Sequence, residues 1–148
     1  MSNTTITVSL TQQQDYRFLI EFGAPVPAVV GDEPPPLGAA AGPSPVQLLT
    51  ASVGNCLSDS LLFALRKFKQ APEPIRTQVL AEVGRNAEGR LRVLSMAAEL
   101  HLGVPAAQLE HLQRVLDTFE QYCTVTQTVA GAVDIKVRVF DSTGQQLK

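Results

Sequence analysis

The sequence contains few cysteines, and its charges are almost balanced. Two cysteines in 148 residues are too few for a disulfide scaffold. Each is therefore either an inert buried thiol or a reactive one, and any disulfide is expected to be transient. The formal net charge is −2, which provides no basic surface for neutralising phosphates. We therefore expect no nucleic-acid partner.

The sequence also lacks the residue patterns of several common sites. Neither C-x-x-C nor H-x-x-x-H occurs, and His101 and His111 are ten positions apart, so we expect no zinc site and no other cofactor. The proline- and glycine-rich segment before Ser44 lacks the G-x-x-x-x-G-K pattern of a phosphate-binding loop. A charged region followed by a continuous apolar core is missing near the start, which predicts no signal peptide and a cytoplasmic location.

The remaining composition is typical of one soluble globular domain. The chain is 45% hydrophobic and 18% charged, and it is long enough to bury a sizeable core. No internal repeat is visible. We therefore treat residues 1–148 as a single domain.

Strand patterns occupy the first 22 residues. The segment "TITVSL" alternates apolar with polar residues, and "YRFLIEF" is rich in aromatic and branched side chains. The polar "TQQQD" between them predicts a hairpin connection. A long segment rich in proline and small residues follows, which predicts a functional or mobile loop with at most a short strand at residues 28–30.

A long helix is predicted to begin at Ser44 and Pro45. A serine N-cap followed by proline at the first helical position is a common helix start. Apolar residues then cover nearly every face as far as the basic "RKFK", which suits a helix C-terminus. Polar residues interrupt this run too often for a membrane span. We therefore predict a buried central helix.

The rest of the chain predicts a hairpin, a second helix and a final strand. "RTQVLAEV" and "LRVLSMAAELHL" flank a turn in which Gly89 can take a positive φ. A helix is predicted from about Pro105, with one apolar stripe at Leu109, Leu112, Leu116 and Phe119. The segment "VDIKVRVF" alternates as a half-buried strand does.

The two cysteines occupy different local settings. Cys56 lies in the middle of the long helix, whereas Cys123 is predicted at or just before a short helix, where backbone N–H groups favour a thiolate. Free cysteines are often buried, so their positions alone favour the interpretation of each as a small apolar core residue. A reactive thiol is the alternative.

Two longer segments resemble the cysteine motifs of the OsmC/Ohr family. The run "GPSPVQLLTASVGNCLSDSL" is similar to the first motif, in which an x-Pro dipeptide opens a long buried helix carrying the first cysteine. The run "YCTVTQTVAGAVDIKVRV" resembles the second, with a cysteine at a helix start before the last strand. The order of elements also agrees. The resemblance implies an α+β fold in which a long central helix is wrapped by antiparallel β-sheet, within an intertwined homodimer.

The resemblance also implies thiol peroxidase chemistry. Cys56 would attack the O–O bond of an organic hydroperoxide and become a sulfenic acid, and Cys123 would condense with it to form a disulfide. In the family a dithiol reductant, typically a lipoyl group, reopens that disulfide. The implied partners are thus a second copy of the chain, the hydroperoxide and the reductant, with no membrane involved.

Activation of the first thiol is where the chain departs from the hydroperoxide-resistance branch. In that branch an N-terminal arginine is held by a glutamate directly after the x-Pro dipeptide, a position that Val46 occupies here. Arg17 is the one arginine before Cys56, and we include it in the candidate site, although a solvent-facing role is commoner for strand arginines. Asp32 and Glu33 could replace the carboxylate, with solvated loop acids as the favoured interpretation.

Other roles remain open for the same residues. Asp59, three positions after Cys56, could orient a cation near the sulfur or, without one, raise the thiol pKa. One alternative is a divergent, non-catalytic dimer that responds to redox state or binds a small apolar ligand. A thiol hydrolase or transferase would need His101 or His111 near Cys56, and both are interpreted as surface histidines.

Overall fold

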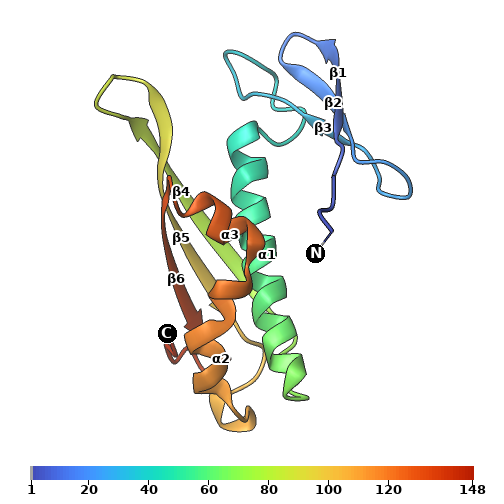
Figure 1. Cartoon of the computed structure of the whole chain (residues 1–148). Helices are drawn as coiled ribbons and strands as arrows, with labels where there is room; N and C mark the ends of the chain where they lie inside the picture. Colours follow the sequence, from blue (N-terminus) through green and yellow to red (C-terminus); the bar gives the residue numbers. More distant parts are fainter. Residues whose placement is uncertain (1) are drawn as a thin grey trace. The chain divides into compact units, whose positions relative to one another are not determined.

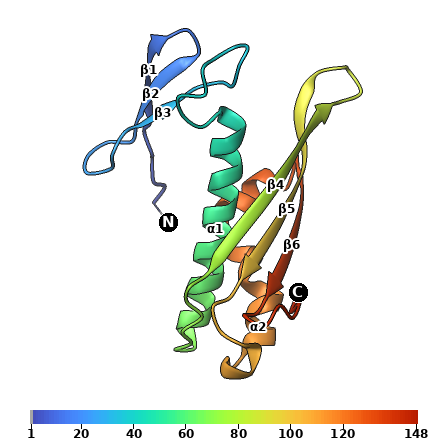
Figure 2. The same cartoon turned by 180° about the vertical axis from the view of Figure 1, so that it is seen from behind.

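The computed structural model describes residues 2–148, and the chain divides into two compact units, Met1–Leu49 and Thr50–Lys148. Both units are drawn in Figures 1 and 2. The helix α1 (Pro45–Lys67) begins in the first unit and supplies the central helix of the second.

The N-terminal unit contains a three-stranded antiparallel sheet. Its strands β1 (Ser9–Gln14), β2 (Arg17–Glu21) and β3 (Val29–Gly31) are ordered β1-β2-β3. The first strand begins later than "TITVSL" predicts, and most of the supposed connection belongs to it. Ile6 is 83% exposed. The alternation of apolar and polar residues in this segment therefore does not mark a strand face that is buried within one chain. The turn instead lies at Asp15, which has a φ of 48°.

The start of α1 matches its prediction closely. The Ser44 hydroxyl accepts the Gln47 N–H at 3.2 Å, and the Gln47 side chain accepts the Ser44 N–H at 2.9 Å. This reciprocal pair is a capping box, which satisfies two backbone donors that the helix itself leaves free. The helix ends at Lys67, with Arg66 and Lys67 in its last turn as expected.

Burial of α1 is less complete than predicted. One face, at Val53, Gly54, Leu57, Leu61 and Leu65, is buried. Phe63, on another face, is 62% exposed. The helix is long and apolar enough to cross a membrane, but it serves as the core helix of the C-terminal unit. A single chain therefore leaves part of its apolar surface uncovered.

The C-terminal unit contains a second three-stranded sheet, of mixed direction. The strands β4 (Arg76–Arg85) and β5 (Leu91–His101) form the predicted hairpin, and Gly89 has a φ of 75°. The last strand, β6 (Asp134–Phe140), pairs with β5 in parallel, so this strand differs from the antiparallel sheet that the resemblance implies. Two parallel strands must be joined by a crossover connection. The long helical segment between β5 and β6 provides it, because it returns the chain to the end of the sheet at which β5 begins.

That connection is more broken than the predicted second helix. It consists of the 3₁₀ turn η1 (Ala106–Gln108), the helix α2 (Leu112–Thr118), the 3₁₀ turn η2 (Phe119–Tyr122) and the helix α3 (Thr124–Val129). The helix α2 starts later than Pro105 because Leu109 is extended and His111 takes a left-handed conformation with a φ of 57°.

The core of this unit lies between its helices and one face of its sheet. Figures 1 and 2 show α1, α2 and α3 on the same side of β4, β5 and β6. Helices and strands contribute buried side chains from facing positions, including Leu57, Leu61, Leu65, Met96, Leu100, Val115, Phe119 and Val139. This packing fixes the middle of α1 against the start of α3.

Candidate active site

Cys56 lies in the middle of α1, beside the face that packs on the core. Its neighbour Leu57 is fully buried, whereas Cys56 itself is half-buried. Two residues further on, the Ser58 hydroxyl lies 2.6 Å from the Thr77 hydroxyl of β4 and ties α1 to the sheet. Cys56 is therefore held on a rigid element while the residue keeps partial exposure to solvent.

Cys123 is the N-cap residue of α3, as predicted, and it is fully buried. Its thiol donates a hydrogen bond to the Thr126 hydroxyl at 2.9 Å, within the first turn of that helix. The Thr126 side chain is itself buried. Sequence analysis missed Thr126, although the spacing of Cys123 and Thr126 is the one that joins an N-cap to the third helical residue.

The two thiols meet in the C-terminal unit. Both cysteines are free, and the Cys56 thiol lies near enough to the Cys123 thiol to raise its pKa. Such proximity is the geometric requirement for a disulfide between residues far apart in the sequence. The fold therefore brings together the two cysteines that the sequence singled out.

The protonation preference of Cys123 differs from the prediction. Burial raises the pKa of the Cys123 thiol, and the neighbouring Cys56 thiol raises it further. The hydroxyl and backbone of Thr126 act in the opposite direction on this pKa, but they do not outweigh burial. The helix start thus acts to favour the thiolate of Cys123, as predicted, but burial of the residue outweighs that effect.

Arg17 and Asp32 form a second candidate group, in the N-terminal unit. Arg17 opens β2, and its Nε lies 3.8 Å from the Asp32 Oδ2. The Arg17 side chain is 34% exposed, yet its Nε is buried and has no hydrogen-bond partner within residues 2–148. A purely solvent-facing role for Arg17 therefore does not describe its guanidinium.

Asp32 is the organising residue of the loop that follows β3. Its carboxylate accepts backbone N–H groups from Glu33 at 2.9 Å and from Ala39 and Ala41 at 3.1 Å each. The hydrogen bond from Ala41 is the largest effect that lowers the pKa of Asp32, against the opposing effect of burial, and the Arg17 charge adds to it. Interpretation as a solvated loop acid is wrong for Asp32, which is 3% exposed.

The other candidates take ordinary structural roles. Asp59 accepts a hydrogen bond from the Asn55 side chain at 2.8 Å. His101 stacks on Phe140 with ring centroids 4.9 Å apart, and His111 packs on Phe68 at 4.6 Å. Among residues 2–148, no group of three or more His, Cys, Asp or Glu side chains could hold a metal ion.

Solved structures of low sequence identity share this fold. A hypothetical protein from Aquifex aeolicus VF5 is 17% identical, with a TM-score of 0.76 over 95% of this chain and 98% of that one. An OsmC-like protein of unknown function from Vibrio cholerae is 14% identical, with a TM-score of 0.79 over 93% and 100%. The organic hydroperoxide resistance protein OhrB of Bacillus subtilis is 17% identical, with a TM-score of 0.68 over 92% and 98%.

The sequence itself matches one family model. No curated protein matches the chain. The model described as "OsmC-like protein" matches residues 38–138, which include α1, both cysteines and all but the end of β6. The chain therefore belongs to the OsmC-like protein family.

Proposed function

We propose that the protein is a thiol-dependent peroxidase that reduces organic hydroperoxides. The observation that carries the proposal is the proximity of the free thiols of Cys56 and Cys123, which lie close enough for Cys56 to raise the pKa of Cys123. A nucleophile and a resolving thiol must meet in this way for a sulfenic acid to be captured. Relatives named as organic hydroperoxide resistance proteins, from Bacillus subtilis and Legionella pneumophila, support the choice of substrate class.

The reaction has three balanced steps. The Cys56 thiolate attacks one peroxide oxygen and breaks the O–O bond, and the departing alkoxide takes a proton and leaves as an alcohol. Cys56 is then a sulfenic acid, which the Cys123 thiol attacks to form the disulfide and release water. A dithiol such as a reduced lipoyl group then restores both thiols by exchange and becomes a disulfide itself.

Burial supports this assignment of the two roles. Cys56 is half-buried, so the residue keeps contact with solvent, whereas Cys123 is enclosed by protein. Burial also raises the pKa of the Cys123 thiol, which keeps that residue protonated while Cys56 reacts. Cys123 then attacks a sulfur that is already next to it.

Arg17 is the cation that we propose for activating Cys56, with Asp32 holding it in place of the family's glutamate. Val46 cannot pair with a guanidinium, whereas the buried Asp32 carboxylate lies beside Arg17 Nε. A fixed cation favours a nearby thiolate. The proposal requires Arg17, from the same chain or from a second copy, to reach the Cys56 sulfur.

A homodimer is part of this proposal. Large apolar side chains are exposed in both units when one chain stands alone, among them Leu10, Val26, Leu37, Phe63 and Leu80. A second copy would cover such surface, as the uncovered faces of α1 require. A reducing cytoplasm would supply the dithiol that the cycle consumes.

One observation favours a second candidate function, the binding of a small apolar ligand without catalysis. The N-terminal unit contains a cavity of about 320 Å³ whose wall is largely apolar, formed in part by Leu10, Phe18, Ile20 and Leu48. Apolar pockets of this size commonly hold small ligands. In that case ligand binding would survive the loss of both cysteines.

Steady-state consumption of cumene hydroperoxide with a dithiol reductant distinguishes these functions. The proposal predicts turnover by the natural protein and none by Cys56→Ser. Cys123→Ser should lose sustained turnover and accumulate overoxidised Cys56. Turnover that survives Cys56→Ser, or no turnover by the natural protein, would contradict the proposed function. Thioester hydrolysis that depends on Cys56 would point to a hydrolase.

A further inference from the structure

The side chain of Lys148 contacts the helical segment that precedes Cys123 at three points. Its ammonium group donates a hydrogen bond to the Leu116 carbonyl at 2.8 Å and lies 3.4 Å from the Glu120 carboxylate. The same nitrogen lies 5.4 Å from the centre of the Phe119 ring, which is fully buried. One cation thus joins the last turns of α2 to the 3₁₀ turn η2 that leads to Cys123.

The backbone of Lys148 is itself fixed to the sheet. A turn in which Gly144 has a φ of 86° reverses the chain after β6. The Val139 N–H then donates to the Lys148 carbonyl at 3.2 Å, and the Lys148 N–H donates to the Val139 carbonyl at 3.3 Å. Because Val139 is fully buried in the core, the Lys148 side chain extends from a fixed point toward the helical segment.

Glu120 connects the lysine contact to Cys123. Its carboxylate lies beside the Lys148 ammonium, while its backbone carbonyl accepts the Cys123 N–H at 3.1 Å. The same carbonyl accepts the side-chain amide of Gln127, on α3, at 3.1 Å. A movement of Glu120 therefore displaces the backbone of the residue whose thiol lies beside Cys56.

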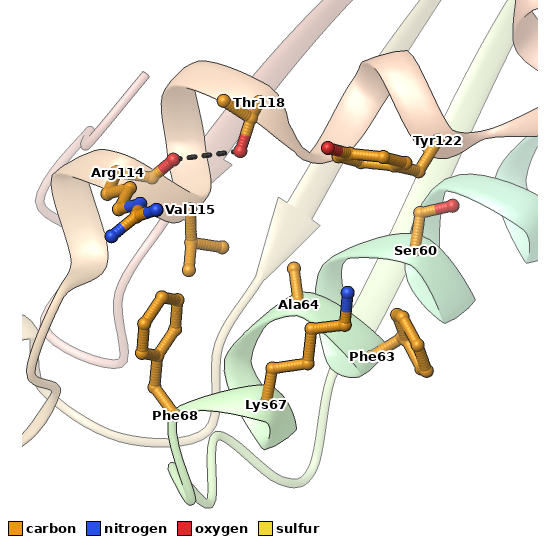
Figure 3. A pocket seen from close by; sticks show the side chains of 9 residues that line it. All are labelled: Ser60, Phe63, Ala64, Lys67, Phe68, Arg114, Val115, Thr118 and Tyr122. Carbon is orange, nitrogen blue, oxygen red and sulfur yellow. Dashed lines mark hydrogen bonds between the residues drawn. The ribbon is translucent and has the colours of Figure 1, made fainter.

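Packing on α1 holds this segment incompletely. A pocket of about 150 Å³ lies between the second half of α1 and the segment formed by α2 and η2. Figure 3 shows Val115 and Tyr122 on one side of this pocket and Ala64 and Phe68 on the other. Side chains that border a void lack contact atoms on that side. Contacts made from β6 by Lys148 therefore matter more for the position of η2.

We propose that Lys148 is a positioning residue for Cys123, which holds η2 so that the Cys123 thiol stays next to Cys56. This inference rests on the proposed function. The step that it assists is the attack of the Cys123 thiol on the Cys56 sulfenic acid, which forms the S–S bond and releases water. Small displacements of reacting groups lower the rate of such a step steeply. Lys148 acts through Glu120 and η2 rather than on either sulfur.

The first test compares Lys148→Met with the natural full chain. Methionine keeps an apolar stem but removes the charge and the hydrogen-bond donor. After addition of cumene hydroperoxide and rapid quenching, the Cys56 sulfenic acid should form at the natural rate. The disulfide should form about threefold or more slowly. Lys148→Arg, which keeps a cationic donor, should restore most of the lost rate. The matched control Lys136→Met removes an exposed lysine of β6 and should leave both rates unchanged.

Alkylation of Cys123 in the reduced protein gives a second readout, which needs no hydroperoxide. The buried thiol reacts when its segment opens locally. Loss of a charge-assisted hydrogen bond should therefore raise the alkylation rate about tenfold in Lys148→Met. Urea unfolding of each variant shows how much of this rise comes from global unfolding.

Diamide separates this proposal from the peroxidase function, because it oxidises two neighbouring thiols to a disulfide without any peroxide. The Cys56–Cys123 disulfide should again form more slowly in Lys148→Met. A natural protein that does not react with cumene hydroperoxide, together with slower diamide oxidation and faster Cys123 alkylation in the variant, would reject the peroxidase function and support the positioning role.

Several results would overturn the positioning role. Lys148→Met could equal the natural protein in disulfide formation and in Cys123 alkylation. Equal effects of Lys136→Met would show a general response to lost positive charge. Sulfenic acid formation that slows as much as disulfide formation, or a rise in alkylation fully explained by lower global stability, would show a general loss of structure. No recovery in Lys148→Arg would show that the cation does not hold the turn.

Discussion

The Cys123 thiol is fully buried and lies beside the Cys56 thiol, although most of the C-terminal unit separates the two residues in sequence. The contact depends on α1 and α3 covering the same face of one sheet (Figure 1). The proposed chemistry therefore depends on the packing of the helices in this unit.

Thr126→Val should slow the formation of the disulfide. The Thr126 hydroxyl accepts the Cys123 thiol at 2.9 Å and acts to lower the pKa of Cys123. Without it, that pKa rises further above neutrality and less thiolate is present, so the resolving step should slow about three- to tenfold. Rapid quenching followed by trapping of the sulfenic acid measures this rate.

Thr128→Val is the matched control for that variant. Thr128 lies on the same helix, and its hydroxyl donates to the Thr124 carbonyl at 2.8 Å on the exposed side. The control should keep the natural rate. Equal rates for Thr126→Val and the natural protein would contradict a role for Thr126 in positioning Cys123.

Asp32→Asn should lower peroxidase activity by about tenfold or more, because a neutral amide no longer holds the Arg17 guanidinium. The lowered pKa of Asp32 means that its carboxylate is charged at neutral pH. The substitution by asparagine therefore removes one negative charge beside Arg17. Glu33→Gln is the control, since it alters the next acid. The rate of Cys56 alkylation against pH separates thiol activation from loss of folding. An unchanged alkylation profile in a folded Asp32→Asn protein would refute this positioning role.

Asp141 should contribute stability that is lost in acid. A side-chain hydrogen bond from Thr143 and a backbone one from Ala106 lower the pKa of Asp141 to about 2 from 3.8. A lowered folded-state pKa gives stability that is present above about pH 4 and lost as pH falls toward 2. Urea unfolding should show Asp141→Asn less stable than the natural protein at pH 6, with the gap narrowing toward pH 2. The exposed control Asp134→Asn should leave stability almost unchanged, and a gap independent of pH would be inconsistent with this linkage.

Gly54→Ala should destabilise the contact between α1 and β4. A Cβ at Gly54 would lie 2.9 Å from Val79 Cγ2, closer than van der Waals contact allows. Overpacking of this kind costs about 1–3 kcal/mol, partly offset by about 1 kcal/mol of helix propensity. Urea unfolding gives the free energy of unfolding for each variant. Adding Val79→Ala should reduce the cost of the glycine substitution, and strict additivity of the two changes would count against the contact.

Local sequence signals predicted the elements well where one chain segment determines them. The Ser44–Gln47 capping box, the turn at Gly89 and Cys123 as an N-cap all depend on neighbouring residues. The family resemblance added the pairing of Cys56 with Cys123, which no local pattern contains. The OsmC-like family itself is confirmed.

Other features depend on contacts between distant residues, which explains why they were missed. The parallel pairing of β6 is set by the path of the whole connection after β5. The raised pKa of Cys123 comes from burial that only the folded unit creates. The sequence did not predict burial of Asp32, because the three backbone N–H groups that bind its carboxylate come from a loop without regular structure. No sequence pattern marks the conformation of such a loop.

Mass spectrometry of the thiols tests the central claim most directly. The reduced protein is mixed with one equivalent of cumene hydroperoxide, quenched within seconds by an alkylating reagent, and analysed intact and as peptides. We predict one disulfide between Cys56 and Cys123, and a sulfenic acid at Cys56 in the Cys123→Ser variant. Two unmodified thiols in the folded protein would contradict the proposed peroxidase function.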